Sequence, residues 1–135
     1  MKALDTNILV RYYLQDDKNQ GLIAYRVMER EVELFVAKTT LLELQWVLSS
    51  NRKTPFPHRQ ISKVIEHLMR LPNVTIEGYD TVLMALESYR RGLDFADALH
   101  LAAAQGCTAM LSFDGRRFVR RANRLNLKPR CEVPV

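Results

Sequence analysis

Short apolar segments alternate with longer amphipathic segments along this chain. This alternation is the sequence feature that most restricts the possible folds. The apolar segments lack the period-two pattern of half-exposed strands, as expected of strands buried on both faces. Strands that alternate with helices favour a mostly parallel sheet with helices on both faces. We therefore predict an α/β fold with a central, mostly parallel sheet of four to five strands. The expected strands are 2–4, 34–37, 74–76, 109–113 and, with weaker support, 131–133; the expected helices are 18–30, 41–49, 59–71, 81–91, 95–105 and 116–124.

Length and residue content narrow the possibilities further. A chain of 135 residues has the size of one ordinary domain, so we expect residues 1–135 to form a single domain. No apolar run approaches the roughly 18 residues of a membrane span, and the N-terminal segment carries polar residues that a signal peptide would lack. Cys107 and Cys131 form neither a metal-binding spacing nor a disulfide framework. We expect a cytoplasmic protein with no membrane association.

Positive charge is concentrated near the C-terminus. From Gly115 onward there are seven Arg or Lys residues and one acid, a balance of about +6, so that the preceding residues carry about −1 of the net +5. Charge asymmetry of this kind suggests a polyanion as partner, although a solvated helix face is the alternative. On the expected helix 116–124, three arginines share one stripe and two share the next. These arginines are Arg116, Arg120 and Arg124, and then Arg117 and Arg121.

Two acids directly follow expected strands. Asp5 stands after the first strand in LDTN, and Asp114 stands after AMLSF. Ligands of open parallel sheets bind at the carboxyl ends of the strands. Either acid alone could simply begin a turn, but Asn, Ser or Gly would serve a turn equally well. We therefore expect Asp5 and Asp114 to lie on one rim of the sheet.

Two more acids occur where helices are expected to begin. Glu43 and Asp97 fall in expected opening turns, which in this topology lie near the same rim. Each has a structural alternative, because acids stabilise helix N-termini. Thr40 and Glu43 have the spacing of a capping box, and Asp94 can act as the N-cap of the helix that carries Asp97. Capping and participation in a site both remain open at this point.

Carboxylates that cluster need a compensating charge. Like charges at short distance raise one another's pKa unless a cation is present. Mg²⁺ and Mn²⁺ prefer oxygen ligands, and such ions can activate water and stabilise the leaving oxygen of a phosphodiester. No Cys or His set has zinc spacing. The pattern therefore predicts a Mg²⁺ or Mn²⁺ site built from Asp5, Glu43, Asp97 and Asp114.

Four motifs together resemble those of the PIN-domain nucleases. They are LDTNILVR, LLELQWVL, GLDFADALHLAAA and LSFDGRRF, in the family's order and approximate spacing over residues 2–118. The resemblance is nearest to the VapC-type toxins of toxin–antitoxin pairs. It implies a PIN-like fold and a Mg²⁺-dependent endoribonuclease that cuts cellular RNA such as tRNA, rRNA or mRNA. It also implies a homodimer that a small antitoxin holds inactive.

The resemblance also assigns roles to individual residues. The conserved acids of the family fall on Asp5, Glu43, Asp97 and Asp114, and Asp94 is a further candidate ligand. The family's polar pair after the first acid falls on Thr6 and Asn7, and Ser112 matches its hydroxyl position before the last acid. The arginine-rich segment would contact RNA or the antitoxin. Two other functions remain open: a PIN nuclease of RNA processing without an antitoxin, and a catalytically silent module that binds RNA or protein.

Overall fold

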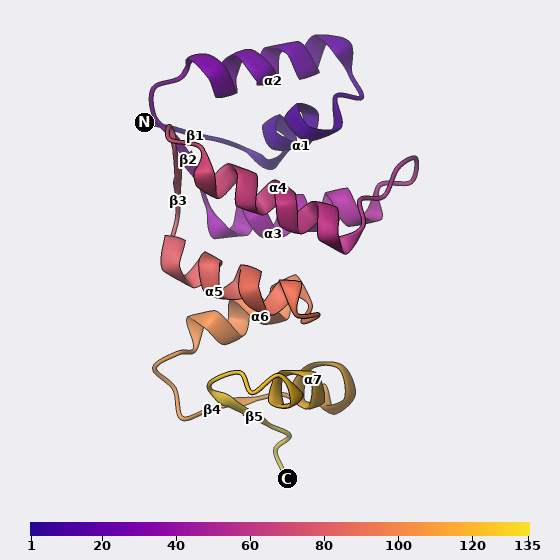
Figure 1. The fold of residues 1–135 in the computed structure, drawn as a ribbon, viewed down its shortest axis with the longest axis vertical. Helices are drawn as coiled ribbons and strands as arrows, with labels where there is room; N and C mark the ends of the chain where they lie inside the picture. Colours follow the sequence, from indigo (N-terminus) through magenta and orange to yellow (C-terminus); the bar gives the residue numbers. More distant parts are fainter. The chain divides into compact units, whose positions relative to one another are not determined.

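The computed structural model describes residues 1–135, which form two compact units, Met1–Tyr79 and Asp80–Val135. Helices and short strands alternate through both units (Figure 1). The N-terminal unit contains β1 (Lys2–Ala3), α1 (Thr6–Leu14), α2 (Lys18–Arg30), β2 (Leu34–Val36), α3 (Lys38–Ser50), α4 (His58–Arg70) and β3 (Val74–Ile76). From the unit boundary onward follow α5 (Tyr79–Arg90), α6 (Phe95–Ala103), β4 (Ala109–Leu111), the π-helix η1 (Gly115–Val119), α7 (Arg120–Arg124) and β5 (Arg130–Glu132).

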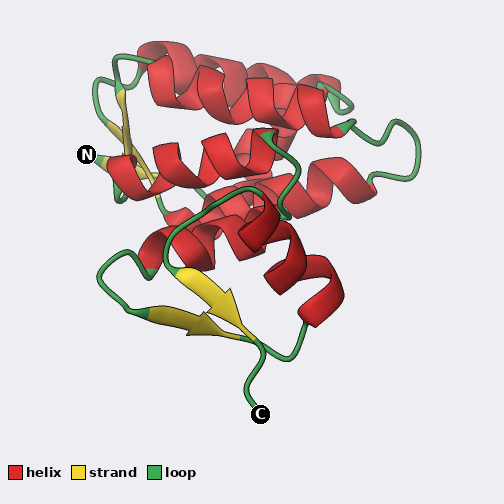
Figure 2. Cartoon of the chain, turned by 60° about the horizontal axis from the view of Figure 1, so that its bottom comes forward, coloured by secondary structure: helices red, strands yellow, loops and turns green.

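All five strands pair in parallel, but in two sheets. β1, β2 and β3 form one sheet in that order, with Leu34 opposite Lys2 and Val74. β4 and β5 form the other, with Met110 opposite Cys131, and appear as the broad yellow arrows of Figure 2. The α/β class, the parallel strands and the weakly supported last strand are therefore confirmed. The single continuous sheet of four to five strands is wrong, because the strands divide three and two.

Apolar helix faces explain the packing within the N-terminal unit. In α4 the buried residues recur at helical spacing, which gives the helix one apolar face. α4 packs against β3 and α3, while α1 packs between α2 and α3. Leu34 and Val36 of β2 are buried, whereas both residues of β1 are exposed, as in an edge strand. The fully buried residues of this unit include Leu9, Leu34, Leu41, Leu44, Leu48, Ile61, Ile65 and Leu68.

The C-terminal unit has a smaller core around α6. Phe95, at the first position of α6, is fully buried and meets Tyr89 edge to face at 5.4 Å between ring centroids. Leu93 and Ala122 are also fully buried. Burial of Phe95 fixes where α6 begins, and thereby places Asp94 and Asp97 at its N-terminal end.

Several local expectations differ from the structure. The helix α1 was not expected, and Thr, Ile, Val and Tyr, which favour strands, make up most of its residues TNILVRYYL. α3 begins at Lys38, three residues earlier than expected. β4 ends at Leu111, and Phe113 is exposed on the surface. None of the helices combines the length and apolar composition that a membrane span requires.

Candidate active site

Asp5 occupies the junction between β1 and α1. It is the N-cap of α1, and its Oδ1 accepts a 2.8 Å hydrogen bond from the Thr6 backbone N–H. This bond holds the exposed carboxylate at the helix N-terminus, where a negative charge is stabilised. The Thr6 hydroxyl next to it is buried without any hydrogen-bond partner. A buried hydroxyl of this kind normally has a partner, so the Asp5 turn contains an unfilled polar position.

Glu43 lies on an exposed face of α3, in the same unit as Asp5. The expected capping box at Thr40 is wrong: α3 starts after Ala37, without any side-chain cap, and Thr40 is itself buried inside the helix. Glu43 therefore does no capping. Because β1 and β2 are parallel neighbours, the helices that follow them, α1 and α3, start at the same edge of the sheet. Asp5 and Glu43 belong to these two helices, which pack together.

The C-terminal unit gathers three acids around one cavity of about 600 Å³, lined by Asp94, Asp97, Asp114, Arg117 and Arg121. Asp94 is the N-cap of α6, as expected, and its Oδ2 accepts from the Asp97 backbone N–H at 3.4 Å. Asp97 follows in the first turn of α6. Asp94 thus caps the helix and also lines the cavity, while its role as a metal ligand stays a prediction.

Asp114 follows β4 and begins η1. Its Oδ1 accepts from the Arg117 backbone N–H at 3.1 Å, and its own N–H donates to the Ser112 hydroxyl at 3.0 Å. Ser112 in turn donates its backbone N–H to the carbonyl of Glu132 in β5. Ser112 therefore connects the β4–β5 sheet to the turn that carries Asp114. This hydroxyl position, expected from the motif, supports the orientation of the last acid.

The electrostatics of this cavity centre on Asp97. Its pKa is raised above the usual value of an aspartate, first because the side chain is partly buried and then because Asp94 and Asp114 lie nearby. His100 and Arg121 act in the opposite direction without cancelling the increase. Burial and the two neighbouring acids thus both disfavour the charged form of Asp97, and a bound cation would favour it.

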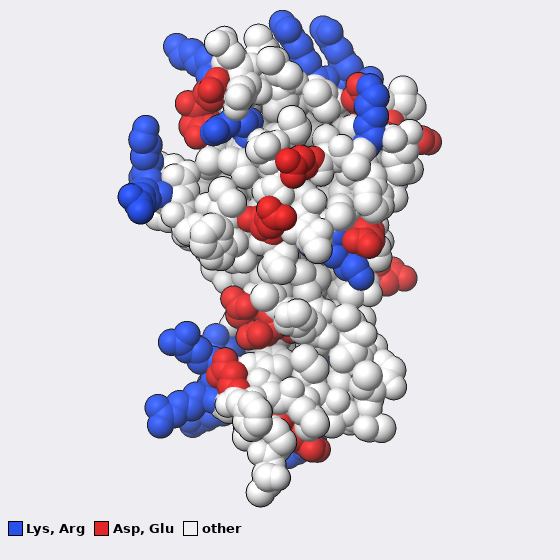
Figure 3. All heavy atoms as spheres, turned by 180° about the vertical axis from the view of Figure 1, so that it is seen from behind, with Lys and Arg blue, Asp and Glu red and all other residues white.

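Only two of the five arginines expected on one helix line this cavity. Residues 116–124 are split between the π-helix η1 and the α-helix α7, so the regular stripes predicted from α-helical spacing do not form. Arg117 and Arg121 line the cavity, and Arg121 also donates to the Gly92 carbonyl at 2.9 Å. Figure 3 shows Lys and Arg side chains beside Asp and Glu side chains in the lower part of the view, on the C-terminal unit.

The donor set fits a hard divalent cation. The side chains around Asp5 and around Asp97 offer carboxylate and hydroxyl oxygens, which Mg²⁺ and Mn²⁺ prefer. The unpartnered Thr6 hydroxyl and the raised pKa of Asp97 are the two observations that favour such an ion. In neither unit do three Asp, Glu, His or Cys side chains lie close enough together to share one ion.

The chain thus combines a parallel α/β fold with acids at strand and helix ends. The chain matches the PIN domain family over residues 2–124 and belongs to that family. PIN domains are generally nucleases, are typically dependent on divalent metal ions, and bind RNA as nucleases. No curated protein matches the chain.

Two polar residues escaped the sequence analysis. Arg11 and Gln20 line a second cavity, in the N-terminal unit, together with Asn7 of the Asp5 motif. Their pairing depends on α1, which was not expected, and on the turn that brings α2 back against it. An Asp directly before Thr6 is also a typical helix N-cap, and this signal would have indicated that α1 begins there.

Proposed function

We propose that this PIN domain is a Mg²⁺-dependent endoribonuclease, a phosphodiester hydrolase in which Mn²⁺ can replace Mg²⁺. The observation that carries the proposal is the cavity lined by Asp94, Asp97 and Asp114 in a member of this family. The three acids can bind a cation, and the two arginines beside them can bind a phosphate. A purely structural role would not require three carboxylates in one cavity.

Each residue of the proposed site has a distinct task. Asp5, Glu43, Asp97 and Asp114 would hold the ion, with Asp94 as an additional ligand or as the group that positions Asp97. When bound, Mg²⁺ supplies water activation and stabilises the leaving oxygen. The α1 N-terminus keeps the Asp5 carboxylate in place through the Thr6 N–H. Thr6 and Asn7 support Asp5, and Ser112 supports Asp114.

The arginines next to the acids would hold the RNA backbone. Arg117 and Arg121 line the acidic cavity and present their charge to a phosphate there. Arg116, Arg120 and Arg124 are exposed on the same η1–α7 segment and would contact RNA outside the cavity, or an antitoxin. A basic side chain of an antitoxin could instead occupy the carboxylates and block the ion.

The proposed biological role is the toxin of a type II toxin–antitoxin pair, acting as a homodimer on tRNA, rRNA or mRNA. The resemblance of the four motifs to VapC-type toxins supports this role. A short open reading frame directly upstream of the gene, adjoining or overlapping it, would be expected for a toxin. Its absence would favour a PIN nuclease of RNA processing without an antitoxin.

The first test is cleavage of single-stranded and hairpin RNA by the purified chain. We expect cleavage with Mg²⁺ or Mn²⁺ and none with EDTA. Asp5→Asn and Asp97→Asn should each lower kcat by about 100-fold or more, because electrostatic groups at a reaction centre contribute about 3–4 kcal/mol. Both variants should keep the circular dichroism spectrum of the wild type. Glu87→Gln, at an exposed acid of α5 outside the cavity, is the matched control.

Two outcomes would contradict the proposal in different ways. Robust cleavage by Asp5→Asn would show that the acids are wrongly assigned. RNA binding by the wild type without any cleavage would favour the catalytically silent binding module. Sequencing of cellular RNA ends after brief expression of wild type and Asp5→Asn would then identify the target.

A further inference from the structure

A second cavity begins two residues after Asp5. It has a volume of about 490 Å³, within the range of about 300–1,000 Å³ typical of small-molecule sites. One wall comes from α1 and the other from α2. The lining residues are Asn7, Ile8, Arg11, Gln20, Ile23 and Ala24. Polar and apolar groups are therefore combined next to the motif that carries the first catalytic acid.

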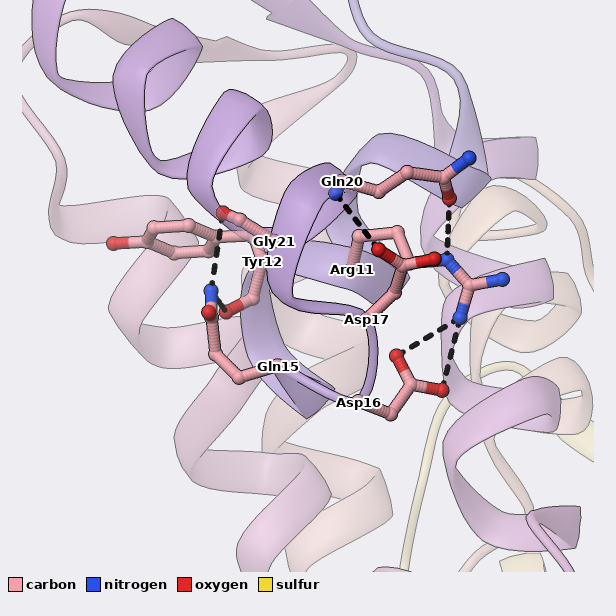
Figure 4. A network of polar contacts seen from close by, with 7 residues as sticks. All are labelled: Arg11, Tyr12, Gln15, Asp16, Asp17, Gln20 and Gly21. Carbon is pink, nitrogen blue, oxygen red and sulfur yellow. Dashed lines mark hydrogen bonds and ion pairs between the residues drawn. The ribbon is translucent and has the colours of Figure 1, made fainter.

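A network of hydrogen bonds holds the polar wall in place (Figure 4). Arg11 Nη1 donates to both carboxylate oxygens of Asp16 at 2.9 Å, and Arg11 Nε donates to Gln20 Oε1 at 2.8 Å. Asp17 caps α2 by accepting from the Gln20 backbone N–H at 2.9 Å. The guanidinium and the amide are thus fixed relative to each other. Preorganised side chains of this kind lose little entropy when they bind a ligand.

Two groups of hydrogen-bond donors remain free in this network. Arg11 Nη2 and Gln20 Nε2 have no partner in the protein and lie on the same side of the network in Figure 4. Both nitrogens are donors only. A ligand that satisfies them must present two acceptors side by side.

The surroundings favour an uncharged ligand over a phosphate. The charge of Arg11 is balanced by the bidentate contact with Asp16, and Asp17 adds a further negative charge. A phosphate would meet a local excess of acid. Ile8, Ile23 and Ala24 provide an apolar wall that suits the face of a flat ring.

We propose that this cavity binds an unpaired RNA base next to the scissile phosphate and selects bases with two adjacent acceptors. This inference rests on the proposed function, because it takes RNA as the substrate and Asp5 as part of the site. Guanine presents N7 and O6 side by side, and cytosine presents N3 and O2. In adenine the lone pairs of N1 and N3 point apart on either side of C2–H, and in uracil the N3–H donor separates O2 from O4. Arg11 and Gln20 are therefore specificity-determining residues for guanine or cytosine.

Variants at neighbouring positions of α2 test the cavity directly. Ile23 is 55% exposed and lines the cavity, whereas Leu22 is 49% exposed and does not. Ile23→Glu and Leu22→Glu add the same charge to the same helix, so any general repulsion of RNA is shared. We expect Ile23→Glu to raise KM about tenfold or more relative to Leu22→Glu. Equal behaviour of the two variants would overturn the proposal.

A variant without the amide tests base selection. Gln20→Met keeps the length of the side chain and leaves the Arg11–Asp16 contact intact. On RNA oligonucleotides that differ only at the nucleotide beside the cleaved bond, it should reduce the preference for guanine or cytosine by about 5- to 100-fold, the range for loss of a paired base contact. Unchanged discrimination in Gln20→Met would contradict the role of Gln20.

Base analogues identify the edge that is bound. If guanine is preferred, inosine should be cleaved equally well, because it keeps N7 and O6, and 7-deazaguanine should be cleaved poorly, because N7 is lost. If cytosine is preferred, 5-methylcytosine should be tolerated, because N3 and O2 are unchanged. Cleavage without regard to base identity would refute the inference and leave the nuclease proposal intact. No cleavage of any RNA by the wild type would instead refute the proposed function itself.

Discussion

At the scale of single residues, Asp97 combines a proposed catalytic task with a cost to stability. Its pKa is raised in the folded chain by burial and by Asp94 and Asp114. The folded state therefore binds the Asp97 proton more tightly than the unfolded state does. The resulting loss of stability is absent below the unfolded pKa of about 3.9, grows as the pH rises through the folded pKa, and is complete above it. Without metal, the cost is therefore larger at high pH than at low pH.

Asp97→Asn should consequently stabilise the metal-free protein while abolishing cleavage. In EDTA at pH 7.5 we expect a higher Tm for Asp97→Asn than for the wild type, with the difference shrinking toward pH 3. Scanning calorimetry across this pH range measures the effect. Glu132→Gln, which removes an exposed acid of β5 outside the cavity, should leave the Tm nearly unchanged. A Tm of Asp97→Asn at or below that of the wild type at pH 7.5 would contradict the electrostatic explanation.

At the scale of elements, the arginines of the η1–α7 segment differ in whether they line the acidic cavity. Arg117 lines it, whereas Arg124 does not. Arg117→Gln should therefore raise the Kd for RNA more than Arg124→Gln, although both variants lose one positive charge. Each lost phosphate contact should also flatten the slope of log affinity against log salt by about 0.7 for single strands. Filter binding across a salt series provides both quantities, and identical effects of the two variants would argue against a special position of Arg117.

The same elements show where sequence periodicity succeeds and where it fails. α2 was predicted to the residue from its amphipathic pattern, and Asp17 caps its start in the structure. α1 was missed because most residues of TNILVRYYL favour strands, and Asp5 was not interpreted as the cap that starts the helix. At α3, Thr40 and Glu43 have capping-box spacing, yet burial of Thr40 inside the helix prevents capping. Local motifs fail here because tertiary packing decides which residue starts the helix.

At the scale of the whole molecule, the acids divide between the two units. Asp5 and Asp114 each follow a strand, as the sequence suggested, but β1 and β4 belong to different sheets, so a common rim of one sheet is not formed. Asp97 and Asp114 line one cavity together with Asp94, whose part in the site the sequence had left open. The periodicity of apolar residues predicts single helices and strands. It does not predict which distant residues bind the same ion, because shared ligands depend on how the elements pack. The four-acid site therefore stays a prediction, supported by family membership.

Metal binding provides a test of that prediction at the same scale. An ion that binds only the folded state stabilises it by about 2.7 kcal/mol when its concentration is 100 times the Kd. If Asp5 of one unit and Asp97 of the other serve the same ion, either Asn variant alone should remove most of the Tm increase that saturating Mg²⁺ gives the wild type. The double variant should then lose no more than each single one, because ligands of one ion are not additive. If each single variant instead kept about half of the increase and the double variant lost all of it, the two units would bind separate ions, and the shared site would be refuted.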